Sequence, residues 1–266
     1  MIPKIIHMVW LSGEPYPALV RRCLRSWRRV LPDYELKIWT MDNFDTQAVR
    51  YVREAVSVRK WAPASDYIRL WALYNYGGVY MDSDVFVRRD FDRWMESEVF
   101  SAIECSLQPI GREDYVDEQG RLLDESIFNV PGIGLQAAVV ASVKGHPFIR
   151  RCMDYFEREP YILPDGSYAN SKFIAPSIFA RMAVDFGFRY VDCEQHLDQG
   201  ILILPSAAIS STLRSVGEQA LAIHCCNGNW NLWVRRTLRQ KLYRRAMPLL
   251  LMRIEWRDRL RRLFKL

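Results

Sequence analysis

This 266-residue chain lacks several features that define other classes of protein. No uninterrupted apolar run reaches the roughly 18 residues that a membrane-spanning helix needs, so we predict no transmembrane segment. The first residues lack the series of basic stretch, apolar stretch and small-residue cleavage site that marks a signal peptide. Internal repeats and low-complexity linkers are also missing, which favours one compact domain over a repeat array.

A disulfide framework is also missing. The six cysteines are scattered along the chain, and a protein of this length can fold on its core alone. We therefore predict a reduced, cytoplasmic setting. The cysteines are Cys23, Cys105, Cys152, Cys193, Cys225 and Cys226.

Half of the residues are hydrophobic, which is enough for one large core. The net charge of +6 is unevenly placed. Residues 230–266 hold twelve Lys or Arg against two acids, a net of +10 that leaves −4 for the rest. We predict a domain over residues 1–231 and a basic helical tail over residues 232–266. Such an asymmetry favours contact with an anionic surface.

The hydrophobic pattern predicts an α/β fold with a largely parallel sheet, because strands and helices alternate through the first ninety residues. Ser65 is the expected cap of the third helix, and Gly77-Gly78 is its expected stop. The predicted elements are strand 4–11, helix 20–31, strand 36–39, helix 46–58, helix 66–76 and strand 79–87.

Asp82 and Asp84 follow the apolar run at residues 79–81. Side chains at i and i+2 of a strand share a face, so both carboxylates are expected at the carboxyl end of this strand, where open α/β sheets bind ligands. Two hard oxygen ligands suit Mg²⁺ or Mn²⁺. A single D-x-D is common, and a solvated acidic turn is the alternative interpretation.

Asp66 and Arg69 lie three residues apart on the preceding predicted helix and share a face. One interpretation is an ion pair on the surface. The other is that this face of the helix is turned toward the acidic strand, so that the carboxylate accepts hydrogen bonds from the hydroxyls of a sugar and the guanidinium donates to them.

These motifs together resemble those of the D-x-D sugar transferases. That group includes yeast initiating mannosyltransferases, bacterial capsular-polysaccharide transferases and the glucosylating domains of clostridial toxins. The resemblance is strong from Ile2 to about Asp92 and faint beyond. It rests on IHMVWLSG at residues 6–13, ASDYIR at residues 64–69 and LYNYGGVYMDSD at residues 73–84.

The resemblance implies a GT-A type fold, a Rossmann-like α/β sheet with one nucleotide-sugar site. It implies that His7 and Trp10 of the first strand belong to that site, with Trp10 packed on the base. It also implies that Asp66 and Arg69 hold the donor sugar. For both first-strand residues, packing in the core is the alternative. Of the paired acids, Asp82 matches the residue that touches ribose, sugar and metal, and Asp84 matches the direct metal ligand.

A second segment, HCCNGNW at residues 224–230, resembles the closing loop of the family. There the resemblance implies that His224 reaches the metal, and that Asn229 and Trp230 grip the leaving phosphate. A serine is usual where Asn229 stands. A core histidine is the alternative for His224. The family retains the anomeric configuration, and Asn129 or Gln136 is expected on the reacting face.

The tail predicts two helices interrupted at Pro248. It carries an apolar stripe and a basic stripe, a combination typical of helices at a membrane surface. An ordinary helix packed on the domain is the competing interpretation, and nucleic-acid binding ranks below both. The apolar stripe is Leu249, Met252, Trp256, Leu260 and Leu263, and the basic stripe is Arg253, Arg257 and Arg261.

The combined prediction is a Mn²⁺- or Mg²⁺-dependent retaining glycosyltransferase with a nucleotide-sugar donor, UDP-sugar before GDP-sugar. Its expected acceptor is a glycan or lipid-linked saccharide of a bacterial polysaccharide, at the inner face of the membrane. The alternatives are a toxin-like protein glycosyltransferase and a non-catalytic membrane-surface adaptor. A phosphohydrolase would need more metal ligands than one D-x-D supplies.

Overall fold

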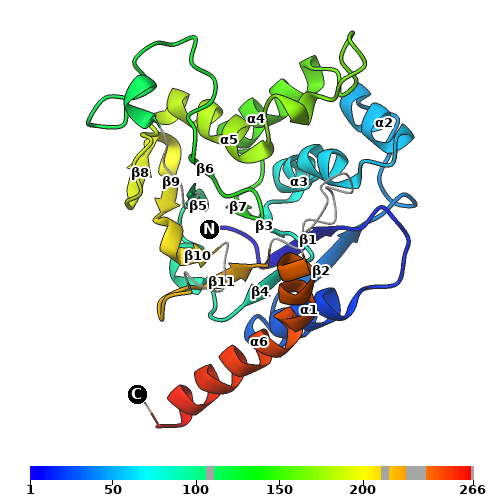
Figure 1. Ribbon diagram of the computed structural model, residues 1–266, viewed down its shortest axis with the longest axis vertical. Coiled ribbons are helices and arrows are strands. Elements are labelled where there is room, and N and C mark those ends of the chain that lie inside the picture. The colour runs from blue at the N-terminus through cyan, green and yellow to red at the C-terminus, as the bar shows by residue number, and fades with distance from the viewer. Residues whose placement is uncertain (106–110, 211–215, 226–237, 265–266) are drawn as a thin grey trace.

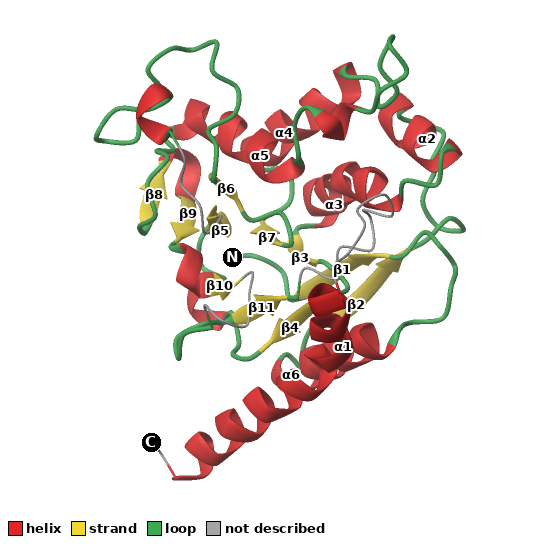
Figure 2. Ribbon diagram, in the orientation of Figure 1, coloured by secondary structure: helices red, strands yellow, loops and turns green. Residues whose placement is uncertain are grey.

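The computed structural model describes residues 1–105, 111–210, 216–225 and 238–264. One central sheet crosses the molecule, in the strand order β2-β1-β3-β7-β5-β9-β8, with β6 paired to β5 (Figure 1). Helices cover both faces of the sheet (Figure 2): α2 to α5 lie on one side, and α1 and α6 on the other. The predicted α/β class is confirmed, with a single central sheet as expected for the GT-A type.

The first half of the chain follows the predicted order of elements, because its apolar spacing matches the period of each element. β1 pairs in parallel with β2 and β3. The bounds are β1 Ile5–Val9, α1 Ala18–Val30, β2 Glu35–Trp39, α2 Arg50–Ser57, α3 Trp61–Tyr76 and β3 Gly78–Met81.

Helix α3 begins earlier than predicted, at Trp61 instead of Asp66. Ser65 is therefore inside the helix and is not its cap, and its hydroxyl donates to the carbonyl of Ala62. The helix can begin before Ser65 because Pro63 lies in its first turn, where proline is well tolerated.

The second half departs from the largely parallel sheet that was expected. β7 lies between β3 and β5 and runs antiparallel to both, whereas β5 and β9 are parallel. The sheet is therefore mixed. The remaining bounds are β5 Val99–Cys105, β6 Ile133–Leu135, β7 Val139–Ser142, α4 Pro147–Arg158, α5 Ala175–Ala183, β8 Gln195–Leu197 and β9 Ile201–Leu204.

The predicted strand 79–87 is split in two. Its first part is β3 of the main sheet, and its second part, β4 (Val85–Val87), joins a separate small sheet. That sheet has the order β10-β11-β4, with β10 Ile209–Ser210 and β11 Ala222–His224. The split occurs at the acidic pair, where Val85 N donates to the carbonyl of Asp82 in a turn.

The tail forms one helix, α6 (Leu238–Phe264), with Pro248 inside it, so the predicted interruption at Pro248 is wrong. A proline removes one i→i−4 hydrogen bond, but Met247 and Leu251 on either side are buried against the domain and hold the helix together. In the described part of the chain no helix combines the length and apolarity needed to cross a membrane. The boundary between residues 231 and 232 lies outside the described residues.

Candidate active site

The acidic pair lies in the turn between the two sheets, and not on a strand as predicted. Asp82 N donates to the carbonyl of Ala138 at 2.9 Å, which ties the turn to the strand beside β3. Cys225 N donates to the carbonyl of Asp84 at 3.1 Å, which ties it to the small sheet. The two carboxylates are therefore held from both sides, at the carboxyl end of β3.

His224 completes a cluster with this pair. β11 runs antiparallel to β4 and sets His224 opposite Val85, next to the acidic turn. Its Nε2 lies 3.5 Å from Asp84 Oδ1 and 3.8 Å from Asp82 Oδ2. One ligand atom from each of the three residues lies within 4.8 Å of the others. Two carboxylates and an imidazole form a donor set that suits Mn²⁺ or Mg²⁺ better than it suits a soft metal that prefers thiolate ligands.

Arg69 connects the acidic turn to α3. Its guanidinium lies 2.7 Å from Asp66 Oδ1 and 3.5 Å from Asp82 Oδ1. It also donates to the carbonyl of Ala137 at 2.6 Å and stands over the ring of Tyr80, with its central carbon 4.5 Å from the centroid. The side chain is 4% exposed, so the Asp66–Arg69 pair is no surface ion pair.

Asp66 occupies an environment that resists ionisation. Burial raises its pKa to about 7, although the charge of Arg69 opposes the shift and that of Asp82 adds to it. A carboxyl group with a strongly shifted pKa beside a metal-ligand cluster is typical of functional sites.

Two residues of the site were not predicted from the sequence. The hydroxyl of Tyr80 donates to Asp82 Oδ1 at 2.7 Å and orients that carboxylate. Glu104 lies near the carboxyl end of β5, which runs in the same direction as β3 because β7 is antiparallel to both. Burial raises the pKa of Glu104, which interacts through its charge with His224, Asp82 and Arg69. The position of Glu104 near the acidic turn could be predicted only from the order of the strands in the sheet, which the sequence pattern does not give.

Trp10 and His7 differ in their surroundings. Trp10 follows β1 at the same edge as the acidic turn, because His7 pairs with Tyr80 in parallel register. It is partly exposed, and its indole N–H donates to the carbonyl of Glu14. Its predicted packing on a nucleotide base stays a prediction.

His7 is fully buried. Its Nδ1 lies 3.2 Å from the indole nitrogen of Trp39, which can only donate, so Nε2 carries the proton and donates to the carbonyl of Gly77 at 2.8 Å. Burial lowers the pKa of His7 below its ordinary value. Both ring nitrogens thus have partners within the core, Nδ1 with Trp39 and Nε2 with Gly77, as in the core alternative, and a donor contact by His7 stays an untested prediction.

Of the remaining predicted residues, Gln136 lies next to the contacts of Arg69, and no contact in the described part of the chain relates Asn129 to the cluster. Gln136 is fully buried next to the residue whose carbonyl binds Arg69, and Asn129 is half-buried before β6. Asn229 and Trp230 lie outside the described residues.

Residues 17–101 match the family model of the glycosyltransferase sugar-binding region containing a DXD motif. The chain is 33% identical over 95 residues to inositol phosphoceramide mannosyltransferase 3 of Schizosaccharomyces pombe, covering 34% of this chain and 26% of the relative. Mannosyltransferase 1 of the same kind and organism is 30% identical over 125 residues, covering 41% and 36%. The apo-form glycosyltransferase GlyE of Streptococcus pneumoniae TIGR4 has a TM-score of 0.45 at 14% identity, covering 93% of this chain and 60% of that one.

Proposed function

We propose that the chain is a metal-dependent glycosyltransferase acting on a nucleotide-sugar donor, because residues 17–101 match the DXD-containing sugar-binding region of the glycosyltransferases. The observation that carries the proposal is that Asp82 and Asp84, in the turn between the two sheets, lie close to His224 at the end of β11. The matched region includes both aspartates, and His224 lies 140 residues beyond Asp84 in the sequence. Such a convergence is not expected of a solvated acidic turn.

The proposed division of roles follows from the contacts. Asp84 and His224 are the metal ligands, and Asp82 joins them while also facing Arg69 and Tyr80. A divalent ion held there would neutralise the charge that develops on the departing diphosphate. Asp66 offers a carboxylate to the hydroxyls of the sugar, and Arg69 holds that carboxylate in place.

We propose that the reaction retains the anomeric configuration. The acceptor hydroxyl attacks the anomeric carbon from the face that the nucleotide diphosphate leaves. The bond from this carbon to the phosphate oxygen breaks as the bond to the acceptor oxygen forms, and the hydroxyl proton passes to the leaving phosphate. Glu104 is a further buried carboxyl group that interacts through its charge with His224, Asp82 and Arg69, and its proposed role is to orient the acceptor.

The donor is either a UDP-sugar or a GDP-sugar. The toxin-like first strand favours UDP. The two relatives from Schizosaccharomyces pombe are named as mannosyltransferases of inositol phosphoceramide, which favours a mannosyl donor. The aligned stretches span 26% and 36% of these relatives. A mannosyl donor is therefore a proposal for this chain, beside a UDP-sugar. A glycan or lipid-linked saccharide is the proposed acceptor.

A hydrolysis screen tests the proposal. The purified chain is incubated with UDP-glucose, UDP-galactose, UDP-N-acetylglucosamine and GDP-mannose, with Mn²⁺ or with a chelator. We expect release of free sugar from one donor, dependent on the metal. Asp84→Ala should lower this rate by at least about 100-fold, because it removes a direct ligand.

Asp90→Ala is the matched control, because Asp90 is exposed and lies six residues from Asp84 in the same segment. It should keep the rate of the unmodified chain. Equal rates in Asp84→Ala and the unmodified chain at saturating donor would contradict the metal site. Metal binding without hydrolysis of any donor would favour the adaptor alternative.

A further inference from the structure

Helix α6 uses one of its faces to pack on the domain. Met247 and Leu251 are buried with Phe86 and Ile223 of the small sheet. Asp258 accepts two hydrogen bonds from the buried Arg88, at 2.7 and 2.8 Å. This face therefore has its partners within the chain.

The opposite face of α6 is apolar and exposed. Trp256 lies about 180° around the helix from Met247 and about 160° from Asp258, at 100° per residue. Four of the nine large apolar side chains that are exposed among the described residues lie on this face, within twelve positions of one another. Their exposures are Leu249 66%, Met252 45%, Trp256 65% and Leu260 41%.

Arginines flank the apolar stripe on both sides. Arg253 and Arg259 are each about 60° from Trp256, in opposite directions around the helix. Arg257 is also exposed, on the same side of the stripe as Arg253. The side chains of Arg261 and Leu263, which complete the predicted stripes, lie outside the described part.

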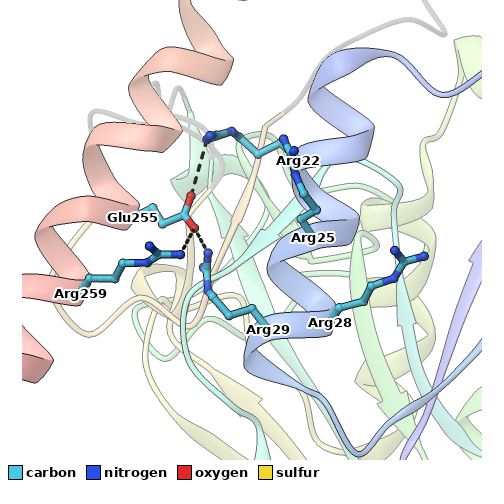
Figure 3. Close-up of a pocket in the computed structure, with 6 residues that line it drawn as sticks. All are labelled: Arg22, Arg25, Arg28, Arg29, Glu255 and Arg259. Carbon is cyan, nitrogen blue, oxygen red and sulfur yellow. Dashed lines mark hydrogen bonds and ion pairs between the residues drawn. The ribbon is translucent and has the colours of Figure 1, made fainter.

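Helix α1 adds arginines beside the Arg259 flank (Figure 3). A hollow of about 530 Å³ between the two helices is lined by Arg22, Arg25, Arg28, Arg29, Glu255 and Arg259. Glu255 forms ion pairs with Arg22, Arg29 and Arg259. Arg25 and Arg28 are exposed and reach the same hollow.

The two acidic residues of α6 are therefore paired with arginines, and arginines outnumber acids around the hollow. Glu255 is shared by three arginines, and Asp258 is bound by Arg88. The lining of the hollow alone holds five arginines and one glutamate. We name the surface formed by the apolar stripe and these arginines the α1–α6 face.

We propose that the α1–α6 face docks on an anionic lipid bilayer. The apolar stripe enters the boundary between headgroups and acyl chains, and the flanking arginines bind lipid phosphates. An apolar stripe between basic flanks is the arrangement that holds an amphipathic helix in the plane of a membrane surface. Guanidinium groups suit phosphate because they can donate two parallel hydrogen bonds.

A nucleic acid would explain the arginines but not the stripe, since exposed leucine, methionine and tryptophan side chains gain little from a duplex backbone. The proposal does not rest on transferase activity, because it concerns a surface formed by α1 and α6 and its test contains no donor.

Sedimentation with lipid vesicles tests the proposal on the full chain. We expect binding to vesicles of phosphatidylcholine with phosphatidylglycerol and none to phosphatidylcholine alone. Binding should weaken with added salt, because exposed charges are screened over about 8 Å at physiological ionic strength. The double variant Arg25→Glu/Arg28→Glu should weaken binding by at least about tenfold.

The matched control is Arg121→Glu/Arg158→Glu. Both of its arginines are exposed elsewhere, and both double variants lower the net charge equally. The control should lose less than about threefold, because its charges lie away from the proposed contact. Trp256→Ser/Leu260→Ser leaves the charge unchanged and should also lose at least about tenfold. Leu123→Ser, at another exposed leucine, should lose nothing measurable.

Four outcomes would overturn the proposal. The first is that the unmodified chain does not sediment with anionic vesicles. The second is an equal loss of binding in the two charge variants, which would make net charge alone responsible. The third is vesicle binding by the apolar variant equal to that of the unmodified chain. The fourth is tighter binding to a fluorescent DNA duplex than to vesicles, unchanged by the apolar substitutions, which would assign the face to nucleic acid.

Discussion

Arg69 connects two acidic groups of the site on different elements, Asp66 of α3 and Asp82 of the turn after β3. Its guanidinium is the shared partner of Asp66 and Asp82, and it also donates to the carbonyl of Ala137. With so many internal partners it serves as a positioning residue. A direct contact with the donor sugar, implied by the family resemblance, stays a prediction.

At a pH of about 9, where Asp66 is ionised beside Arg69, we expect Arg69→Met to lower the free energy of unfolding by about 3–5 kcal/mol, because Asp66 loses its cation and must stay buried as an unpaired carboxylate or take up a proton. Urea denaturation followed by tryptophan fluorescence measures the change. Adding Asp66→Asn should return at least about 1 kcal/mol, because the amide carries no charge to compensate.

Arg121→Met is the control, because this arginine is exposed, and its effect should stay within about 0.5 kcal/mol. If Arg69→Met and Arg121→Met unfold at the same urea concentration, the buried ion pair does not hold the site together.

Individual residues were predictable where local spacing carried the signal. Asp82 and Asp84 lie close together as the spacing predicted, although they do so in a turn and not on one face of a strand. The approach of His224 followed only from the family resemblance, because no local pattern joins residues so far apart. Glu104 was missed for the same reason: its neighbours in space come from three other parts of the chain. The burial of Arg69 depends on Ala137, which the spacing along α3 cannot indicate.

Helices and strands were predicted correctly where each apolar segment of the sequence forms a single element of the fold. β1, α1 and β2 lie within a few residues of their expected bounds. The strand predicted over residues 79–87 failed because its two apolar halves belong to different sheets. Periodicity cannot distinguish a continuous strand from two short strands joined by a turn, and this turn is where the acidic pair lies.

The junction between α3 and β3 depends on Gly78. Its φ of +111° is rarely adopted by other residues, and a Cβ there would lie 2.5 Å from the carbonyl oxygen of Ile5. We expect Gly78→Ala to lower the free energy of unfolding by about 2–6 kcal/mol, from backbone strain and from the clash with β1. Chemical denaturation measures this.

Two other glycines separate these causes. Gly187 has a φ of +92° but open space around its Cβ position, so Gly187→Ala reports strain alone. It should cost about 1–2 kcal/mol. Gly217 has neither strain nor a close neighbour, and Gly217→Ala should cost nothing. A loss in Gly78→Ala no larger than that in Gly187→Ala would show that β1 yields to the added methyl group.

Across the whole molecule, α6 joins two properties that the sequence presented as alternatives. The helix packs on the domain, and it also exposes its apolar stripe. A pattern of apolar residues cannot decide between these, because it does not indicate which side meets the domain. Here the domain meets Met247 and Leu251, which lie outside the predicted stripe. Deleting the helix would therefore disturb the small sheet that carries His224, so point substitutions are the better test.

Leu251 and Leu249 separate the two faces, since they are the same residue type two positions apart and about 160° from each other around the helix. Leu251 is fully buried, so Leu251→Ala should lower the free energy of unfolding by about 2–5 kcal/mol. Leu249→Ala should change it by less than about 0.5 kcal/mol. Sedimentation with anionic vesicles should give the reverse order, with weaker binding in Leu249→Ala and unchanged binding in folded Leu251→Ala. If Leu251→Ala weakens vesicle binding as much as Leu249→Ala does, the two faces of α6 do not act separately.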